Sequence, residues 1–337
     1  MEWTGKSVLI TGGTGSFSTN FIKHLLSLVR PKVIRIYSRD EHKQTQFLET
    51  YGGIRGDKDW PVRGFIGDVR DLDRLKRAME GIDIVIHAAA LKQVQSCEYN
   101  PLEAIKTNIE GSANVIEAAL HNNVEKVLAV STDKAVAPLN LYGSTKMVME
   151  KLFINANSYR GQNHRTKFAC TRYGNVADSR GTVVHIWREQ IKRGEQVSVT
   201  DWDATRFWIT MRQANQFVME CVELMDELDG GEIFCPKMPS VSVRELYQAV
   251  CGMEHPVNVI GSRIGDKLHE DLILKEELPR TTLYKSRYVV LPQNPAWAYS
   301  PPLHIAPNVH SGYGLTSSNN DVYLDAEQIE RSLQTVS

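Results

Sequence analysis

A tyrosine and a lysine that lie four residues apart could act together on a hydroxyl group. Tyr142 and Lys146 belong to the run Tyr-Gly-Ser-Thr-Lys at the start of an expected helix, so both side chains share one helical face. A nearby ammonium lowers the pKa of a phenol, and the phenolate can take the proton of a hydroxyl while hydride leaves the same carbon. The spacing alone is common on amphipathic helices. Its place after the expected strand end Ser131-Thr132-Asp133-Lys134 makes the pair a candidate for alcohol oxidation.

A glycine-rich turn would hold the hydride acceptor for such an oxidation. It follows an apolar strand predicted over Ser7–Thr11 and precedes a helix expected from about Phe17 to Val29. Glycines let the backbone approach a pyrophosphate, which then lies on the positive end of the helix. We expect these residues of the turn to bind a dinucleotide: Gly12, Thr14, Gly15, Ser16 and Phe17. A plain chain connection is the alternative, and the strand–turn–helix context makes it the weaker one.

The end of the second predicted strand indicates which dinucleotide binds. Ser38, Arg39 and Lys43 offer a hydroxyl and two cations for a 2′-phosphate, which favours NADP. Asp40 keeps NAD open, because an acidic residue near this strand end can accept the ribose 2′-hydroxyl. A solvated, charged helix start is the further alternative. Residues after the next two strands complete the expected cofactor site: Asp68 and Val69 beside the adenine, and Ala88 and Ala90 beside the dinucleotide.

The pattern of the first half predicts an α/β fold with a doubly wound (Rossmann) parallel sheet. Further buried strands are expected at Val33–Tyr37, Arg63–Gly67, Asp83–His87, Lys126–Ser131 and Lys167–Tyr173. The longest helices between them are expected at Leu102–Leu120 and Tyr142–Tyr159. Ligands of such sheets bind at the carboxyl ends of the strands. We predict an NADP-binding domain over residues 1–174 and a smaller substrate-binding domain over 175–337, with some chain crossing back to the first.

Composition excludes several other classes of protein. The 39 Lys and Arg residues nearly balance the 40 Asp and Glu residues, so the chain lacks the basic excess of a nucleic-acid binder. No run of apolar residues is long enough to span a membrane. The cysteines form no Cys-x-x-Cys pair and are expected as buried thiols, which disfavours a metal site or a disulfide framework: Cys97, Cys170, Cys221, Cys235 and Cys251. We expect a cytoplasmic protein without a metal.

Taken together, these runs resemble the extended short-chain dehydrogenase/reductase family. Within it, they are most similar to the configuration-inverting UDP-N-acetylglucosamine 4,6-dehydratases of pseudaminic acid biosynthesis. The similar segments include Thr-Gly-Gly-Thr-Gly-Ser-Phe from Thr11, Tyr-Ser-Arg-Asp from Tyr37, His-Ala-Ala-Ala-Leu-Lys-Gln-Val from His87, Ser-Thr-Asp-Lys-Ala from Ser131, Leu-Tyr-Gly-Ser-Thr-Lys from Leu141, Thr-Arg-Tyr-Gly-Asn-Val from Thr171 and Gly-Asp-Lys-Leu-His-Glu from Gly265.

The resemblance implies roles for the strand-end residues. Oxidation at C4 of the sugar acidifies the hydrogen at C5. Lys134, if desolvation lowers its pKa, would remove that hydrogen, and Asp133, protonated or through a water, would protonate the departing C6 hydroxyl. Thr132 belongs to the same catalytic group and contacts the substrate. A surface turn with a weak ion pair is the alternative for the Asp-Lys pair.

The resemblance also implies the substrate contacts and the assembly. Lys92 would reach both the nicotinamide and the sugar, while Lys146 would also hold the nicotinamide ribose. Further residues would hold the UDP-sugar: Asn175 the sugar nucleotide, Arg206 and Arg263 the diphosphate or uridine, and Glu270 the ribose hydroxyls. The two long helices resemble a pair that forms a dimer interface, so a homo-oligomer is expected.

Three other functions stay open at this point. A 4-epimerase of a related UDP-sugar would use the same Tyr142 and Lys146 but has no need of Asp133 and Lys134. A C5-retaining dehydratase is the second. Several membrane-associated relatives with that outcome carry Met at the tyrosine position, so Tyr142 favours the inverting branch. A catalytically silent NADP-sensing regulator is the third, and an intact Tyr142 and Lys146 oppose it.

Overall fold

The computed structural model describes residues 3–51, 60–161, 165–177, 179, 181–293, 295, 297, 299–300 and 314–334. In this part of the chain nine strands form one sheet in the order β14-β15-β10-β6-β5-β4-β1-β2-β3. Their bounds are β1 Ser7–Thr11, β2 Val33–Ser38, β3 Val62–Ile66, β4 Ile84–His87, β5 Lys126–Val130, β6 Lys167–Thr171, β10 Ile233–Pro236, β14 Thr281–Tyr284 and β15 Arg287–Val290.

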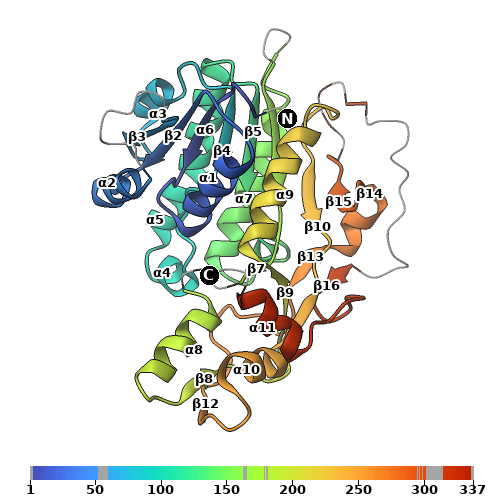
Figure 1. Ribbon diagram of the computed structural model, residues 1–337. Helices are drawn as coiled ribbons and strands as arrows, with labels where there is room; N and C mark the ends of the chain where they lie inside the picture. The colour runs from blue at the N-terminus through green and yellow to red at the C-terminus, as the bar shows by residue number, and fades with distance from the viewer. Residues whose placement is uncertain are drawn as a thin grey trace.

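The sheet confirms the predicted α/β fold, with one addition at its edge. Strands from β3 across to β10 pair in parallel, and fully buried strands such as β1 explain the apolar runs without alternation. The sequence pattern missed β14 and β15, which pair antiparallel with each other and with β10. Because β10, β14 and β15 follow residue 174, the second half of the chain crosses back into the main sheet (Figure 1).

Helices cover both faces of the sheet. Helix α1 packs against α9 on one face, and α6 packs against α3 and α7 on the other (Figure 1). The helices around the sheet are α1 Ser16–Leu28, α2 Glu41–Thr50, α3 Leu72–Ala78, α4 Val94–Tyr99, α5 Pro101–Ile105, α6 Gly111–His121, α7 Leu141–Ala156 and α9 Met211–Leu224. The helix expected over Leu102–Leu120 is therefore interrupted, because one π-helical turn, η1 (Lys106–Glu110), separates α5 from α6.

Helix α7, which carries Tyr142 and Lys146, has a defined start. The Asn140 side chain accepts a hydrogen bond of 2.8 Å from Gly143 N and caps the helix. A Cβ at Gly143 would lie 2.1 Å from the carbonyl oxygen of Lys134. Only glycine permits this approach, so the first turn of α7 rests directly on the backbone of η2 (Asp133–Ala135). This contact brings the tyrosine helix against the Asp-Lys pair.

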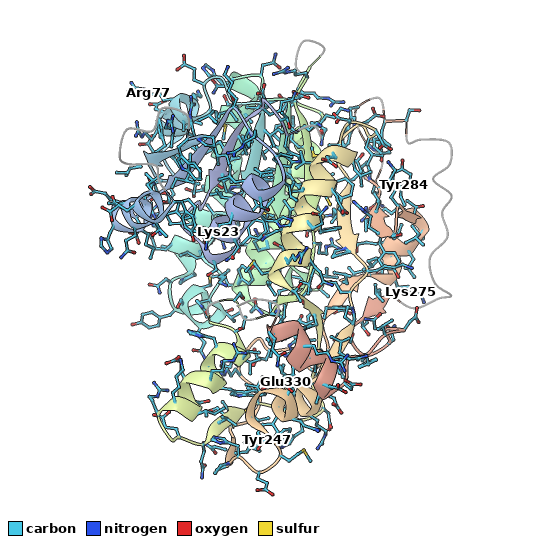
Figure 2. The ribbon with its side chains drawn as sticks, in the orientation of Figure 1. Lys23, Arg77, Tyr247, Lys275, Tyr284 and Glu330 are labelled. Atoms are coloured by element: carbon cyan, nitrogen blue, oxygen red, sulfur yellow. The ribbon has the colours of Figure 1, made fainter. Side chains whose placement is uncertain are left out.

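A smaller lobe lies beyond the carboxyl ends of the strands (Figure 1). Its elements are β7 Asn175–Val176, α8 Val183–Lys192, β8 Val197–Val199, β9 Thr205–Ile209, β11 Ser240–Ser242, α10 Val243–Cys251, β12 Val257–Val259 and α11 Ala326–Gln334. The lobe has its own apolar core, in which Tyr247, labelled in Figure 2, meets Trp187 and Trp202 edge to face. The remaining elements are β13 (Asp271–Ile273), which pairs with β16 (Leu315–Thr316), and the 3-10 turn η3 (Lys275–Arg280), which packs against β14 and β15.

Candidate active site

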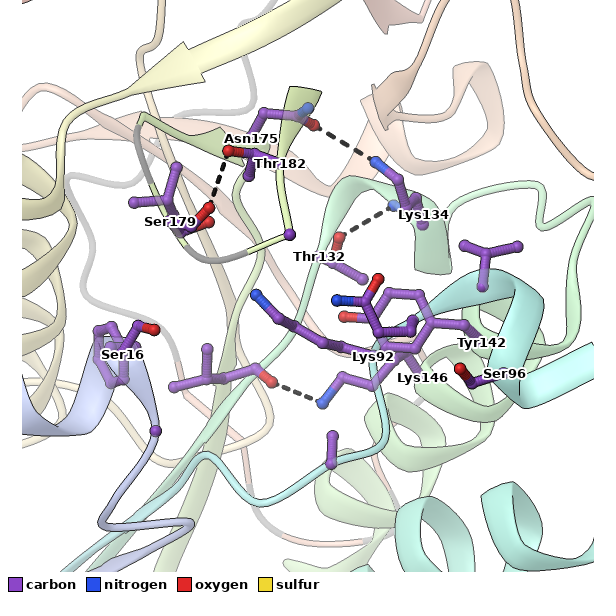
Figure 3. Close-up of a pocket in the computed structure, with 18 of the residues that line it drawn as sticks. Ser16, Lys92, Ser96, Thr132, Lys134, Tyr142, Lys146, Asn175, Ser179 and Thr182 are labelled. Atoms are coloured by element: carbon purple, nitrogen blue, oxygen red, sulfur yellow. Dashed lines mark hydrogen bonds between the residues drawn. The ribbon is translucent and has the colours of Figure 1, made fainter. Parts of the chain in front are cut away.

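One cavity of about 900 Å³ lies at the carboxyl ends of the strands, between the sheet and the smaller lobe. It brings together every predicted site residue except Asp133. The predicted residues that line it are Gly12, Thr14, Gly15, Ser16, Phe17, Ser38, Arg39, Lys43, Asp68, Val69, Ala88, Ala90, Lys92, Thr132, Lys134, Tyr142, Lys146, Asn175, Arg206, Arg263 and Glu270. Figure 3 shows several of them converging from separate elements.

The glycine-rich turn forms a cradle at one end of the cavity. Gly12 has a φ of +66°, and a Cβ there would lie 2.9 Å from the backbone of Ala89. The first turn of α1 has Gly15 at its N-cap, with no side chain that caps the free N–H groups. These two features fit a dinucleotide pyrophosphate on the helix N-terminus. Sequence reasoning undervalued Gly13, where a Cβ would lie 2.7 Å from the side chain of Ile36.

The residues at the end of β2 and the start of α2 differ in whether their side chains are available to bind the ribose of a dinucleotide. Gln44 Nε2 donates to the Ser38 hydroxyl oxygen at 3.0 Å, which orients this hydroxyl and leaves its proton able to donate to a phosphate. Asp40 caps α2 through Lys43 N and pairs with Lys43 Nζ at 2.7 Å. Arg39 is more than half exposed and lies 3.7 Å from the carboxylate of Asp68. Both oxygens of Asp40 therefore face Lys43, while the Arg39 guanidinium stays open to a ligand.

Lys134 is held by three acceptors at once. Its Nζ lies 3.2 Å from Asp133 Oδ1, 3.0 Å from Glu270 Oε1 and 3.4 Å from Asn175 Oδ1. Burial lowers the pKa of this ammonium, but the carboxylates of Asp133 and Glu270 outweigh burial and hold the pKa above its usual value. The lowered pKa that the base role of Lys134 would require is therefore not what this structure gives, because Asp133 and Glu270 together outweigh desolvation.

Asp133 lies behind the cavity wall and does not line it. Its side chain is completely buried, and burial raises the pKa of the carboxyl while the Lys134 ammonium opposes the rise. The Thr132 hydroxyl donates to Asp133 Oδ1 at 2.9 Å and also lines the cavity. A raised pKa fits the expected acid. Direct contact between Asp133 and a substrate hydroxyl is not what this geometry offers, and Thr132 stands between them.

Tyr142 and Lys146 lie on one face of α7, as predicted, but their side chains serve different neighbours. Burial raises the pKa of Tyr142 to about 12, and the Lys134 ammonium and the Thr132 hydroxyl oppose that rise. Lys146 Nζ instead donates to Val130 O at 2.7 Å, and burial lowers its pKa to about 8. The expected cation beside the phenol is therefore Lys134 in this structure, and Lys146 acts on the strand end.

The expected substrate residues are spread along the opposite wall. Glu270, expected to accept ribose hydroxyls, is buried and directs Oε1 at Lys134, with Arg206 Nε at 4.0 Å. Arg206 Nη1 donates to the carbonyls of Thr205 and Leu268. Arg263 is exposed at the rim, and Lys92 projects into the cavity (Figure 3). The structure thus places Glu270 with the Asp-Lys pair rather than with an exposed nucleotide pocket.

The comparisons with known proteins agree with this arrangement. Residues 8–292 match the family described as "Polysaccharide biosynthesis protein", which consists of extended short-chain dehydrogenases/reductases. The chain belongs to this family. It is 42% identical over 335 residues to the inverting UDP-N-acetylglucosamine 4,6-dehydratase of Campylobacter jejuni subsp. jejuni serotype O:23/36 (strain 81-176), and the match covers 97% of both chains.

Two further similarities define how far this family membership reaches. The UDP-glucose 4-epimerase of Rickettsia bellii (strain RML369-C) is 40% identical over 281 residues, covering 82% of this chain and 80% of that protein. The X-ray structure of Pen from Bacillus thuringiensis superposes with a TM-score of 0.87 at 33% identity, covering 100% of this chain and 99% of the other. The protein is an enzyme of the nucleotide-sugar dehydratase/epimerase type.

Two observations bear on the expected surroundings of the protein. Among the described residues, no helix combines the length and the apolar character that crossing a membrane requires. Four cysteines are buried thiols as predicted, whereas Cys251 is only half-buried at the end of α10. Its apolar flanks on a short amphipathic helix suggested a deeper position than the lobe provides.

Proposed function

We propose that the protein is a C5-inverting UDP-N-acetylglucosamine 4,6-dehydratase that uses NADP. One observation carries the proposal: Asp133, Lys134 and Tyr142 meet at the carboxyl end of β5, beside the cradle that suits a dinucleotide. An alcohol oxidation needs only the tyrosine and the cofactor. The additional acid and base pair suits removal of water across C5 and C6.

The cofactor supplies the chemistry that protein side chains lack. When bound in the cradle, NADP would accept hydride from C4 and return it to C6. Gly12 and the open first turn of α1 suit its pyrophosphate. Arg39, which is open to ligand, and Lys43 suit the 2′-phosphate, and the engagement of Asp40 with Lys43 weakens the case for NAD.

The first proton transfer belongs to Tyr142. Its oxygen takes the proton of the C4 hydroxyl, and the Lys134 ammonium and the Thr132 hydroxyl favour the phenolate against the effect of burial. Lys146 holds the strand end through Val130 O, and its ammonium would also bind the nicotinamide ribose of a bound cofactor. The product of this step is a 4-keto sugar whose C5 hydrogen is acidic.

Elimination then requires one base and one acid. Lys134 has to release a proton before it can take the one at C5, and this release costs free energy because Asp133 and Glu270 hold the pKa of the ammonium above its usual value. Glu270 Oε1 at 3.0 Å is the nearest acceptor. Asp133, whose pKa burial raises, would protonate the departing C6 oxygen through Thr132 once the Thr132 hydroxyl, which donates to Asp133 Oδ1 in this structure, turns to accept from the protonated carboxyl; the C6 oxygen then leaves as water. The C5–C6 double bond would then take up the hydride at C6, and a solvent-derived proton that reaches C5 on the opposite face would invert its configuration.

A 4-epimerase is the second candidate, because a UDP-glucose 4-epimerase is 40% identical to this chain. The test is to incubate the purified protein with UDP-N-acetylglucosamine and to measure the mass of the nucleotide sugar. The proposal predicts a product lighter by one water. An unchanged mass with a new C4 epimer supports the epimerase. The same assay with UDP-glucose compares the two sugars.

We further propose that the chain acts as a homo-oligomer through the surface of α5 and α7. Leu102 on α5 is 67% exposed, and Met147 on α7 and Tyr99 at the end of α4 are exposed as well. Large apolar side chains gathered on neighbouring helices are typical of an interface. Sedimentation equilibrium of the purified protein tests this, and a monomer at micromolar concentration contradicts it.

A further inference from the structure

Glu150 is a buried carboxylate one helical turn beyond Lys146 on α7. Lys146 Nζ donates to Val130 O at 2.7 Å, and the Ser131 hydroxyl donates to Glu150 Oε1 at 2.7 Å. Two side chains spaced four apart on α7 thus bind two consecutive residues at the end of β5. This pair of bonds fixes the register between the helix that carries Tyr142 and the strand end that precedes Thr132.

The same carboxylate binds a buried arginine. Arg172, which follows β6, donates from Nε to Glu150 Oε1 at 3.1 Å and from Nη2 to Glu150 Oε2 at 2.7 Å. Its Nη1 donates to Glu277 Oε2 at 2.8 Å and to Leu272 O at 2.9 Å. Arg172, Glu150 and Glu277 are all nearly inaccessible to solvent. Together these three side chains form one buried ion-pair network that extends from α7 to η3.

Such a buried ion-pair network is weak evidence for a role in stability. Burying three charges costs desolvation energy, and well-packed apolar residues often stabilise a protein equally or better. Its hydrogen bonds instead join segments of the chain that carry active-site residues. Glu150 binds the segment that leads to Asp133, Arg172 precedes Asn175 by three residues, and Leu272 follows Glu270 by two. The three segments that surround Lys134 are therefore connected behind the cavity by this ion-pair network.

We propose that Glu150 is a positioning residue of the reaction, which sets the register of α7 against the end of β5 and supplies the negative charge behind Lys146. It touches neither cofactor nor substrate, since it does not line the cavity. It acts through Ser131 and Lys146 on one side and through Arg172 on the other. The inference rests on the proposed function: its rate assay needs the proposed sugar substrate, and its binding assay needs the proposed NADP site.

The charge of Glu150 also acts on Lys146. Burial lowers the pKa of this ammonium to about 8, while Cys170 on β6 and Glu150 on α7 raise it. His87 on β4 also faces it, and burial together with the Lys146 charge lowers the pKa of that imidazole to about 3, so it stays neutral. Without the Glu150 charge, the pKa of Lys146 falls, and the ammonium is lost at a lower pH. Glu277 binds the same arginine but neither α7 nor Ser131.

The test compares Glu150→Gln with Glu277→Gln, which removes one charge from the same arginine on its other side. Two quantities are measured: the rate of NADPH formation on mixing with UDP-N-acetylglucosamine, and the pH dependence of NADPH binding by fluorescence titration without sugar. E150Q is expected to slow the first by roughly tenfold to hundredfold, as misplacement by about 1 Å does. Its loss of affinity with rising pH should begin at a lower pH. E277Q should shift neither quantity to that extent.

Ser131→Ala separates the register from the charge. It removes the hydrogen bond between Ser131 and Glu150 but keeps the carboxylate. The rate should therefore fall, while the pH dependence of NADPH binding stays that of the wild type. S131A also keeps the test decisive if E150Q does not fold, because a wild-type rate in S131A overturns the proposal.

Equal behaviour of E150Q and E277Q in both quantities also overturns the proposal. The ion-pair network would then serve folding alone. If the wild type does not convert UDP-N-acetylglucosamine, the proposed function fails. The pH dependence of NADPH binding still decides whether Glu150 acts on Lys146.

Discussion

Replacing Lys134 by alanine should separate the oxidation from the elimination. Tyr142, Thr132 and the cofactor cradle are all present in Lys134→Ala, so C4 can still be oxidised, although more slowly because Tyr142 loses the ammonium that favours its phenolate. The C5 hydrogen, however, has lost the base that lies between Asp133 and Glu270. We expect NADPH and a 4-keto sugar nucleotide to accumulate on the variant, with little loss of water.

The size of the effect follows from the contacts of the ammonium. Loss of a general base slows its step by about 10²–10⁴, or roughly 3–5 kcal/mol in the barrier. The folded state also loses a countercharge between two buried carboxylates, which costs about 3–5 kcal/mol when one partner of a buried pair is removed. Asp133 reduces this cost by keeping a proton, since burial raises its pKa.

A second buried lysine provides the control. Lys126 at the start of β5 pairs with Asp226 at 2.5 Å, at the end of the strand away from the cavity. Lys126→Ala should lower the melting temperature as Lys134→Ala does, yet keep solvent deuterium incorporation at C5. Deuterium at C5 and water loss are read by NMR and mass spectrometry. If Lys134→Ala exchanges C5 and dehydrates at the wild-type rate, Lys134 is structural and another residue is the base.

The other predictions concern the tyrosine, the cofactor and a remote carboxyl. Tyr142→Phe should bind the sugar nucleotide normally but give no transient NADPH absorbance on mixing, and near-normal turnover contradicts its role. Arg39→Asp should reverse the preference from NADP to NAD in fluorescence titrations at equal ionic strength, and a wild type that prefers NAD refutes the argument. Burial raises the pKa of Glu232 from its ordinary 4.5 to about 7. The native carboxyl therefore keeps a proton that the unfolded chain releases, and stability should fall by about 3 kcal/mol as pH rises from 4.5 through 7. Glu232→Gln should lack that fall in urea titrations at pH 5 and pH 8, and an equal fall in both proteins contradicts it.

Local patterns predicted the elements that position the site. Apolar runs located β1, β2, β4, β5 and β6, and the glycine-rich turn located the cradle. The antiparallel strands β14 and β15 escaped because they are short and lie in the weakly patterned second half. The π-helical turn at Lys106–Glu110 also escaped, because it is a single turn inside a run that stays helical from α5 to α6.

One capping signal shows the same limit. The runs Thr210-x-x-Gln213 and Ser242-x-x-Glu245 both predict reciprocal caps, and the first forms as expected. In the second, Ser242 caps α10, but the Glu245 carboxylate accepts from Ala326 N at the start of α11. The Glu245 carboxylate thus binds a backbone N–H that lies eighty-one residues away in the chain instead of the N–H of Ser242. Spacing alone does not reveal such a competitor.

The catalytic group was predicted by residue type, and its electrostatics were not. The adjacent Asp133 is visible in the sequence, but Glu270 lies far from Lys134 along the chain, so nothing local indicates that a second carboxylate also raises the pKa of the lysine. The roles of Lys146 and Lys134 beside Tyr142 changed for the same reason. A pKa depends on charges brought together by the fold, which only the three-dimensional arrangement supplies.

The most direct test of the whole account is the reaction in D₂O. The wild-type protein is incubated with UDP-N-acetylglucosamine, and the product is examined by NMR for deuterium and configuration at C5. The account predicts a 4-keto-6-deoxy product that carries one deuterium at C5 with inverted configuration. Retained configuration at C5 contradicts the inverting assignment, and a C4 epimer with its C5 hydrogen intact contradicts the dehydratase itself.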